Sequence, residues 1–204
     1  LLGSELNRLA SLFVSVCERH RRHRDYTRHE LREALLETAV WFPVYRTYVR
    51  PGDGSVSKTD GGYVFEAVKR AAGERDDLDP ELFRFLEDLL LLRIEGSLES
   101  EIAVRFQQLT GPAMAKGMED TAFYRYNRLV PLNEVGGDPG LFGRSPEEFH
   151  AACEEAQRER PFALLASTTH DTKRSGDVRA RLALLSEIPA EWAAAVGRWS
   201  GLCD

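Results

Sequence analysis

The chain has 204 residues, of which 43% are hydrophobic and 29% are charged, a composition typical of a globular protein with a substantial core. Its formal net charge of −6 argues against general nucleic-acid binding, because neutralising phosphates requires a basic surface. The longest aliphatic run, Leu89–Leu92, is far shorter than the roughly 20 apolar residues of a membrane span. We therefore expect no nucleic-acid partner and no membrane association.

Two features bear on the origin of the chain. The cysteines Cys17, Cys153 and Cys203 are far apart and odd in number, which does not suit a disulfide framework and favours a reducing, cytoplasmic location. The sequence begins Leu1-Leu2-Gly3-Ser4, without Met, and we expect it to be a piece of a longer protein.

Helical periodicity dominates, and about seven or eight helices are expected. Apolar residues recur at spacings of three and four along residues 6–16, 31–42, 82–90, 98–109, 149–156, 178–185 and 192–199. Thr27-x-x-Glu30 has the form of a capping box, and Asp79-Pro80-Glu81 and Ser145-Pro146-Glu147 are further start signals.

Strand signals are few. Residues 44–49 are rich in β-branched and aromatic side chains and end at a Pro-Gly turn. Residues 162–166 form a short apolar run that is typical of a strand buried on both faces, as in a parallel sheet. The predicted fold class is therefore mainly α, a multi-helix segment with one or two short strands.

Two polar regions invite a metal-site interpretation that the sequence does not support. Residues 51–62 contain Asp-Gly pairs, but Val64 stands where a calcium loop needs a closing Glu, so a surface loop is predicted. His20, His23 and His29 are surrounded by arginines and lack further ligands, so a solvated helix end is predicted. We expect no metal and no cofactor.

Residues 111–139 combine many charged and amide side chains with Phe123, Tyr124 and Tyr126. Such a mixture suits a carbohydrate, whose hydroxyls need hydrogen-bonding partners and whose C–H faces stack on aromatic rings. An ordinary charged loop after a helix has the same composition, and the composition alone does not separate the two.

Polar residues also follow the predicted strand, in Ser167-Thr168-Thr169-His170-Asp171-Thr172. The carboxyl end of a buried strand is where α/β folds place their chemistry. A hydrolase triad is disfavoured, because His170 and Asp171 are adjacent and no Gly-x-Ser-x-Gly motif presents the serine.

Three segments carry a resemblance to a known family. Arg105–Asn127, Leu132–Pro139 and Ser167–Arg174 resemble the maltooligosyltrehalose synthases, and shorter echoes occur at Glu5–Ala10 and Phe42–Tyr48. The resemblance implies a fragment from the C-terminal half of a (β/α)8-barrel enzyme of the α-amylase superfamily. Such enzymes convert the reducing-end α-1,4 bond of a maltooligosaccharide into an α,α-1,1 bond.

The resemblance also implies roles for individual residues. Asp171 would be the catalytic carboxylate that binds hydroxyls of the distorted sugar, with His170 on the same ring and Lys173 on the neighbouring glucose. The remaining implied substrate-binding residues, which include the lining of a reducing-end pocket, are Lys116, Glu119, Asp120, Arg125 and Tyr126. The domain expected is a single helical one, 1–204, in which residues 160–175 form a barrel strand and its substrate-binding loop.

The departures limit what this chain can do alone. Retaining chemistry needs a nucleophile and an acid about 5–5.5 Å apart, and no segment here resembles either of those family motifs. Gly176 also stands where the family pattern leads us to expect Glu. We expect the fragment to be inactive without the remainder of the barrel, its predicted partner besides the maltooligosaccharide.

Two other interpretations remain to be weighed. A stand-alone helical protein-interaction module would close its own core, whereas an excised barrel segment would expose an apolar patch above the roughly 600 Å² usual for monomers. A complete glycosidase is disfavoured because the acid and the nucleophile are missing.

Overall fold

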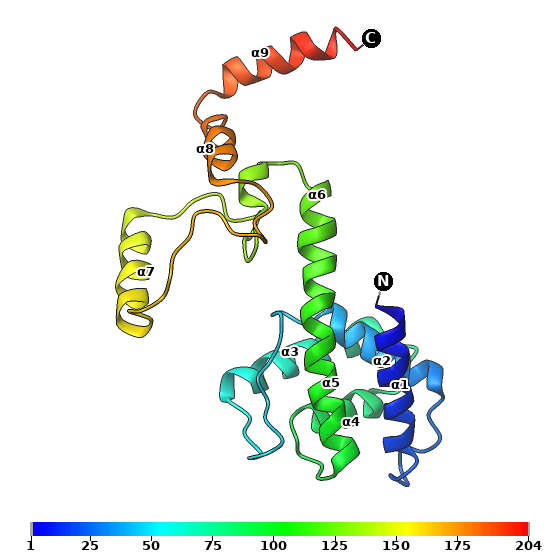
Figure 1. The fold of residues 1–204 in the computed structure, drawn as a ribbon. Helices are drawn as coiled ribbons and strands as arrows, with labels where there is room; N and C mark the ends of the chain where they lie inside the picture. Colours follow the sequence, from blue (N-terminus) through cyan, green and yellow to red (C-terminus); the bar gives the residue numbers. More distant parts are fainter. Residues whose placement is uncertain (1, 204) are drawn as a thin grey trace. The chain divides into compact units, whose positions relative to one another are not determined.

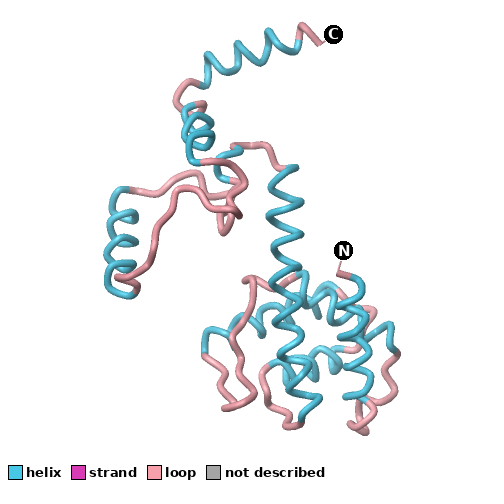
Figure 2. Tube along the Cα trace, viewed as in Figure 1, coloured by secondary structure: helices cyan, strands magenta, loops and turns pink. Residues whose placement is uncertain are grey.

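The computed structural model describes residues 2–203, and within them it is helical with no sheet (Figures 1 and 2). The chain divides into two compact units, the first ending at Gly117 and the second beginning at Met118. The helices of the first unit are α1 (Gly3–Cys17), α2 (Arg28–Val40), α3 (Lys58–Glu74), α4 (Pro80–Leu90) and α5 (Ser97–Met114). The π-helix η1 (Ala115–Ala122) and α6 (Phe123–Arg125) follow, then the 3-10 helix η2 (Val130–Leu132), α7 (Pro146–Glu159), α8 (Gly176–Leu184) and α9 (Pro189–Ser200).

The first unit is a helical bundle with one apolar core. α1 packs against α2 and α5, and α3 packs against α2 and α4. The predicted apolar face of α1 is buried, because its residues recur at helical spacing toward these neighbours. Fully buried aromatic and aliphatic side chains fill the centre, among them Phe13, Leu31, Leu86, Ile102 and Phe106.

Three predicted helix starts are confirmed by their caps. The Thr27 side chain accepts the Glu30 N–H while the Glu30 carboxylate accepts the Thr27 N–H, which completes the capping box of α2. Asp79 caps α4 ahead of Pro80, and a second capping box starts α7 at Ser145.

Helix α3 was not predicted, and the surface loop expected over residues 51–62 is wrong from Lys58 onward. Ser57 caps this helix by accepting a hydrogen bond from the Asp60 N–H. Gly61 and Gly62 lie in its first turns, and such a pair of glycines is more typical of a loop in sequence. Its buried face consists of small side chains, Val64, Ala67, Val68 and Ala71, whose helical spacing is a weaker signal than that of larger residues.

His20 and His23, which follow α1, are partly buried and do not form a simple solvated helix end, whereas His29 is exposed. The His20 ring nitrogen lies 3.0 Å from the Glu99 carboxylate, and the His23 ring stacks on Phe85 with centroids 3.8 Å apart. Burial lowers the pKa of His23 below its ordinary value, and the carboxylate of Glu81 only partly offsets that effect. Residues 2–203 contain no group of three or more His, Cys, Asp or Glu side chains placed to hold a metal.

Neither predicted strand is formed within residues 2–203. Around residue 49 a side chain takes the place of a neighbouring strand: Gln107 accepts the Val49 N–H at 2.7 Å and donates to the Val49 carbonyl at 3.1 Å. Residues 162–166 have no paired neighbour, and Phe162, Leu164 and Leu165 are 95–98% exposed. A barrel strand at 162–166 in a longer protein stays a prediction.

One domain is predicted over residues 1–204, whereas the described residues form two compact units. The reason is the distribution of the core: among the described residues from Met118 onward, Phe123 is the one buried hydrophobic side chain. In the described part of the chain, none of the helices has the length and apolar character that crossing a membrane requires.

The three cysteines are expected to differ sharply in reactivity. Cys17 is buried in the core, and burial raises the pKa of its thiol to about 12, whereas Cys153 and Cys203 are exposed. Because the thiolate is the reactive form, a thiol reagent should modify two cysteines rapidly and Cys17 only after denaturant is added. Rapid reaction of all three in the native chain would contradict this packing, and a Cys17→Ser variant identifies the slow site.

Candidate functional site

The second unit contains a cluster of charged side chains around Lys173. Glu119 and Asp120 come from η1, the π-helix that follows α5, and π-helical turns are frequent at functional sites. Lys173 comes from the loop that precedes α8, and its ammonium lies 3.3 Å from a Glu119 oxygen and 2.8 Å from an Asp120 oxygen. The structure therefore joins two segments that are more than 50 residues apart in sequence.

Two side chains of this cluster are buried, and the charges in it affect the pKa of Lys173. The side chains of Lys173 and Glu119 are only 7% and 5% exposed. The hydrogen bond to Asp120 raises the pKa of Lys173 above its ordinary value, with a further contribution from Glu119 against the opposing effect of burial. Lys173 therefore stays charged, and an ammonium has three donors, of which these two carboxylates occupy two.

A third carboxylate, that of Glu134, contacts the same loop. Its Oε1 accepts the backbone N–H of Lys173 at 2.9 Å, and its Oε2 lies 3.4 Å from the guanidinium of Arg179 on α8. Burial alone would raise the pKa of Glu134, but the N–H groups of Val135 and Lys173 and the charge of Arg179 together lower it. Glu134 is therefore held as an anion.

His170 and Asp171 lie in the same loop, and both side chains are exposed. Thr169 Oγ1 accepts the Asp171 N–H at 3.3 Å, and the Thr172 hydroxyl donates to the Thr169 carbonyl at 2.9 Å. Among residues 2–203 no hydrogen bond engages the side chain of His170 or Asp171. Both groups are therefore presented to solvent on a loop whose backbone is fixed.

The structure brings together only some of the residues predicted for the site. Lys173, Glu119 and Asp120 meet directly, whereas Lys116 precedes the boundary of the second unit at Gly117. The remaining two, Arg125 and Tyr126, are exposed at the end of α6.

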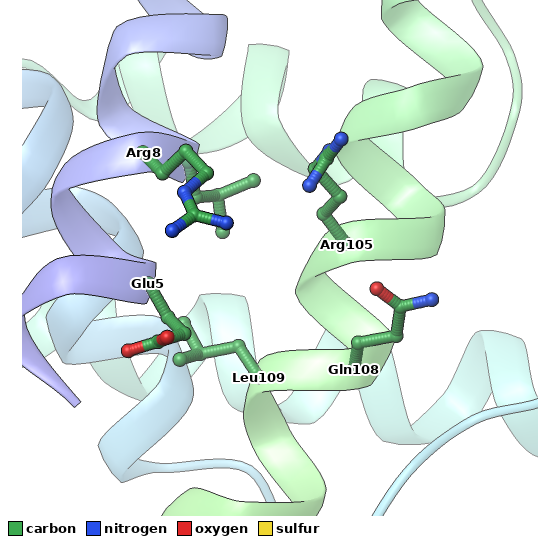
Figure 3. Close-up of a pocket in the computed structure, with 6 residues that line it drawn as sticks. Glu5, Arg8, Arg105, Gln108 and Leu109 are labelled. Carbon is green, nitrogen blue, oxygen red and sulfur yellow. The ribbon is translucent and has the colours of Figure 1, made fainter.

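Two of the hollows outside this cluster differ in size and lining. One, of about 150 Å³, lies between α1 and α5, where Arg8 and Arg105 face each other across the opening (Figure 3). The other, of about 400 Å³, belongs to the second unit, and in it the Arg128 guanidinium stacks over the Phe142 ring at 4.4 Å beside Trp192. Neither contains a residue predicted for the site.

Comparison with known proteins bears on the family. No family model matches the chain. Over 97 residues it is 50% identical to a Mycobacterium tuberculosis protein assigned as a maltooligosyl trehalose synthase, a match that spans 48% of this chain and 13% of that protein. The maltooligosyltrehalose synthase structure from Arthrobacter ramosus matches 98% of the chain with 36% identity and a TM-score of 0.79. The chain resembles a segment of maltooligosyltrehalose synthase.

A second solved structure, a hypothetical maltooligosyl trehalose synthase from Sulfolobus tokodaii, matches 98% of the chain with 26% identity and a TM-score of 0.60. The chain spans only 23% and 25% of the two solved synthase chains, as a fragment of such an enzyme would. The predicted mainly α fold class is thus confirmed, the likeness is consistent with a fragment of such an enzyme, and a stand-alone interaction module is not favoured.

The sequence indicated Asn133 and Glu134 only as members of the mixed polar segment 111–139, and it did not indicate Arg179 at all. Glu134 and Arg179 support the loop, and Asn133, which is buried, donates its amide to the carbonyl of Phe123 at 2.8 Å. The signal for Asn133 and Glu134 was their position inside a segment that resembles maltooligosyltrehalose synthase. No comparable signal marks Arg179, because its partner is 45 residues away.

Proposed function

We propose that this chain supplies part of the substrate site of a maltooligosyltrehalose synthase. The reaction is an intramolecular transglucosylation: the α-1,4 bond at the reducing end is broken, and the released glucose re-attacks to form an α,α-1,1 bond. A (β/α)8 barrel of the α-amylase superfamily and a cytoplasmic location are part of this proposal. The unpaired cysteines support that location.

The observation that carries the proposal is the ion-paired contact of Lys173 with Glu119 and Asp120. Lys173 lies two residues after Asp171, in the same loop as His170. Retaining glycosyl transfer passes through an oxocarbenium-like transition state, in which hydrogen bonds to the ring hydroxyls strengthen. An exposed carboxylate on a fixed loop suits that role. We therefore propose that Asp171 binds the ring hydroxyls and that His170 contacts the same sugar ring.

The charged cluster has a separate role in this scheme. Lys173, Glu119 and Asp120 form a polar wall on which the re-attacking glucose turns before the new bond forms. Because two donors of Lys173 are directed at carboxylates, one remains for a sugar hydroxyl. Lys116, Arg125 and Tyr126 complete the proposed substrate-binding set, and the nucleophile and the acid come from the rest of the enzyme.

Incubation with maltopentaose tests the proposal. A full-length maltooligosyltrehalose synthase containing this sequence should lower the concentration of reducing ends, because the product is non-reducing. The amount of free glucose released should be smaller than the amount of reducing ends lost. A rise in reducing ends would instead indicate a hydrolase and overturn the proposed reaction.

The chain of 204 residues is expected to be inactive by itself, because it supplies one of the carboxylates that the chemistry requires. The measurement is product formation from maltopentaose at high protein concentration, with the full-length enzyme as the positive control. Formation of any maltooligosyl trehalose by the isolated chain would contradict this division of the catalytic groups.

A further inference from the structure

The loop that carries His170 and Asp171 needs support from outside itself. Its internal contacts, Thr169 with Thr172 and the Gly176 N–H with the Thr168 hydroxyl at 2.9 Å, close the loop locally but do not attach it to the rest of the unit. The Lys173 side chain attaches to η1, but a lysine side chain is long and flexible and fixes the backbone weakly.

Glu134 attaches the backbone directly at the far end of the loop. It lies after η2, and one of its oxygens accepts the Lys173 N–H two residues beyond Asp171. The Val135 N–H donates to the same oxygen at 2.9 Å, which fixes the orientation of the carboxylate.

Arg179 attaches the near end. One guanidinium nitrogen pairs with Glu134, and another donates to the carbonyl of Ser167, where the loop begins. The planar guanidinium can make both contacts at once because its donors are arranged as a rigid fork. The side chains of Glu134 and Arg179 are only 15% and 25% exposed, so solvent screens the pair weakly.

We propose that Glu134 and Arg179 form a clamp that holds the loop between Ser167 and Lys173 and thereby positions Asp171 for the transition state. This inference rests on the proposed function. Neither residue touches substrate in this scheme, so both are positioning residues, and their effect on the reaction passes through the backbone that carries Asp171.

The first test measures amide hydrogen exchange of residues 168–174 in the 204-residue chain. Glu134→Ala should raise exchange at Lys173 by about tenfold or more, because a charge-assisted bond to its N–H is lost. Glu134→Gln keeps an acceptor oxygen and should give an intermediate increase. The matched control is Glu154→Ala, which removes an exposed carboxylate of α7 outside this cluster.

Arg179→Lys separates the clamp from the general effect of charge. Lysine keeps the positive charge but cannot reach Glu134 and the Ser167 carbonyl together, so exchange at the near end of the loop should rise. Because Arg179→Lys retains the ion pair with Glu134, it should fold. It therefore still tests the clamp if Glu134→Ala does not fold. Unchanged exchange throughout the loop in Arg179→Lys and Glu134→Gln would overturn the clamp.

The second test measures kcat and KM of the full-length enzyme with maltopentaose. Glu134→Ala should lower kcat at least tenfold with less than a threefold change in KM, and Glu134→Gln should recover part of the loss. Faster loop exchange with unchanged kcat would overturn the positioning role. If the unmodified enzyme fails to convert maltopentaose, the proposed function fails, while the exchange data still decide whether the clamp exists.

Discussion

Asp171→Asn in a full-length maltooligosyltrehalose synthase containing this sequence is expected to lower kcat by about 10³-fold with little change in KM. The substitution keeps the shape of the side chain but removes the charge that strengthens hydrogen bonds to the sugar in the transition state. Steady-state kinetics with maltopentaose measures the effect.

The fold should be unaffected by this substitution, because the Asp171 side chain is exposed and engages no hydrogen bond within residues 2–203. The melting temperature of the variant checks that point. Asp25→Asn, at an exposed position of the first unit, is the matched control and should retain full turnover. Near-normal kcat in Asp171→Asn would refute the catalytic assignment.

Phe13→Ala is expected to lower the free energy of unfolding of the first unit by about 3–5 kcal/mol. The Phe13 ring is fully buried at the centre of the bundle and stacks on Phe85 with centroids 5.9 Å apart. Removing it leaves a cavity between helices that cannot close without shifting α1. Denaturant unfolding followed by circular dichroism measures the loss.

Phe162→Ala is the matched control, because it makes the same substitution at a ring that is 95% exposed in the second unit. It should change the free energy of unfolding by less than about 0.5 kcal/mol. A loss below about 1 kcal/mol in Phe13→Ala would mean that the core of the first unit is not packed around this ring.

Local signals predicted most of the helices. The capping box at Thr27 and the Asp79-Pro80 start depend on neighbouring residues only, so they can be identified without knowing the fold. The missing strand at residues 44–49 shows the limit of that reasoning. At its end the Val49 backbone pairs with the side chain of Gln107, a partner 58 residues away that no local pattern reveals.

The site shows the same division between local and distant information. The resemblance indicated Lys173, Glu119 and Asp120 as sugar contacts. The structure shows that the Lys173 ammonium forms ion pairs with both carboxylates. Their pairing depends on how η1 and the loop before α8 come together, which spacing alone cannot predict. Glu134 and Arg179 were missed as site residues for the same reason.

The π-helical turn of η1 makes the length of this segment matter as well as its composition. Hydrogen bonds in a π-helix close over five residues, so successive side chains advance by less than the roughly 100° per residue of an α-helix. Glu119 and Asp120 are neighbours in this segment, and both contact the one ammonium of Lys173. Deleting a single residue before Glu119 would rotate both carboxylates together by about 100° about the helix axis and change the direction in which they face. Homologous chains should therefore tolerate substitutions here more readily than insertions or deletions.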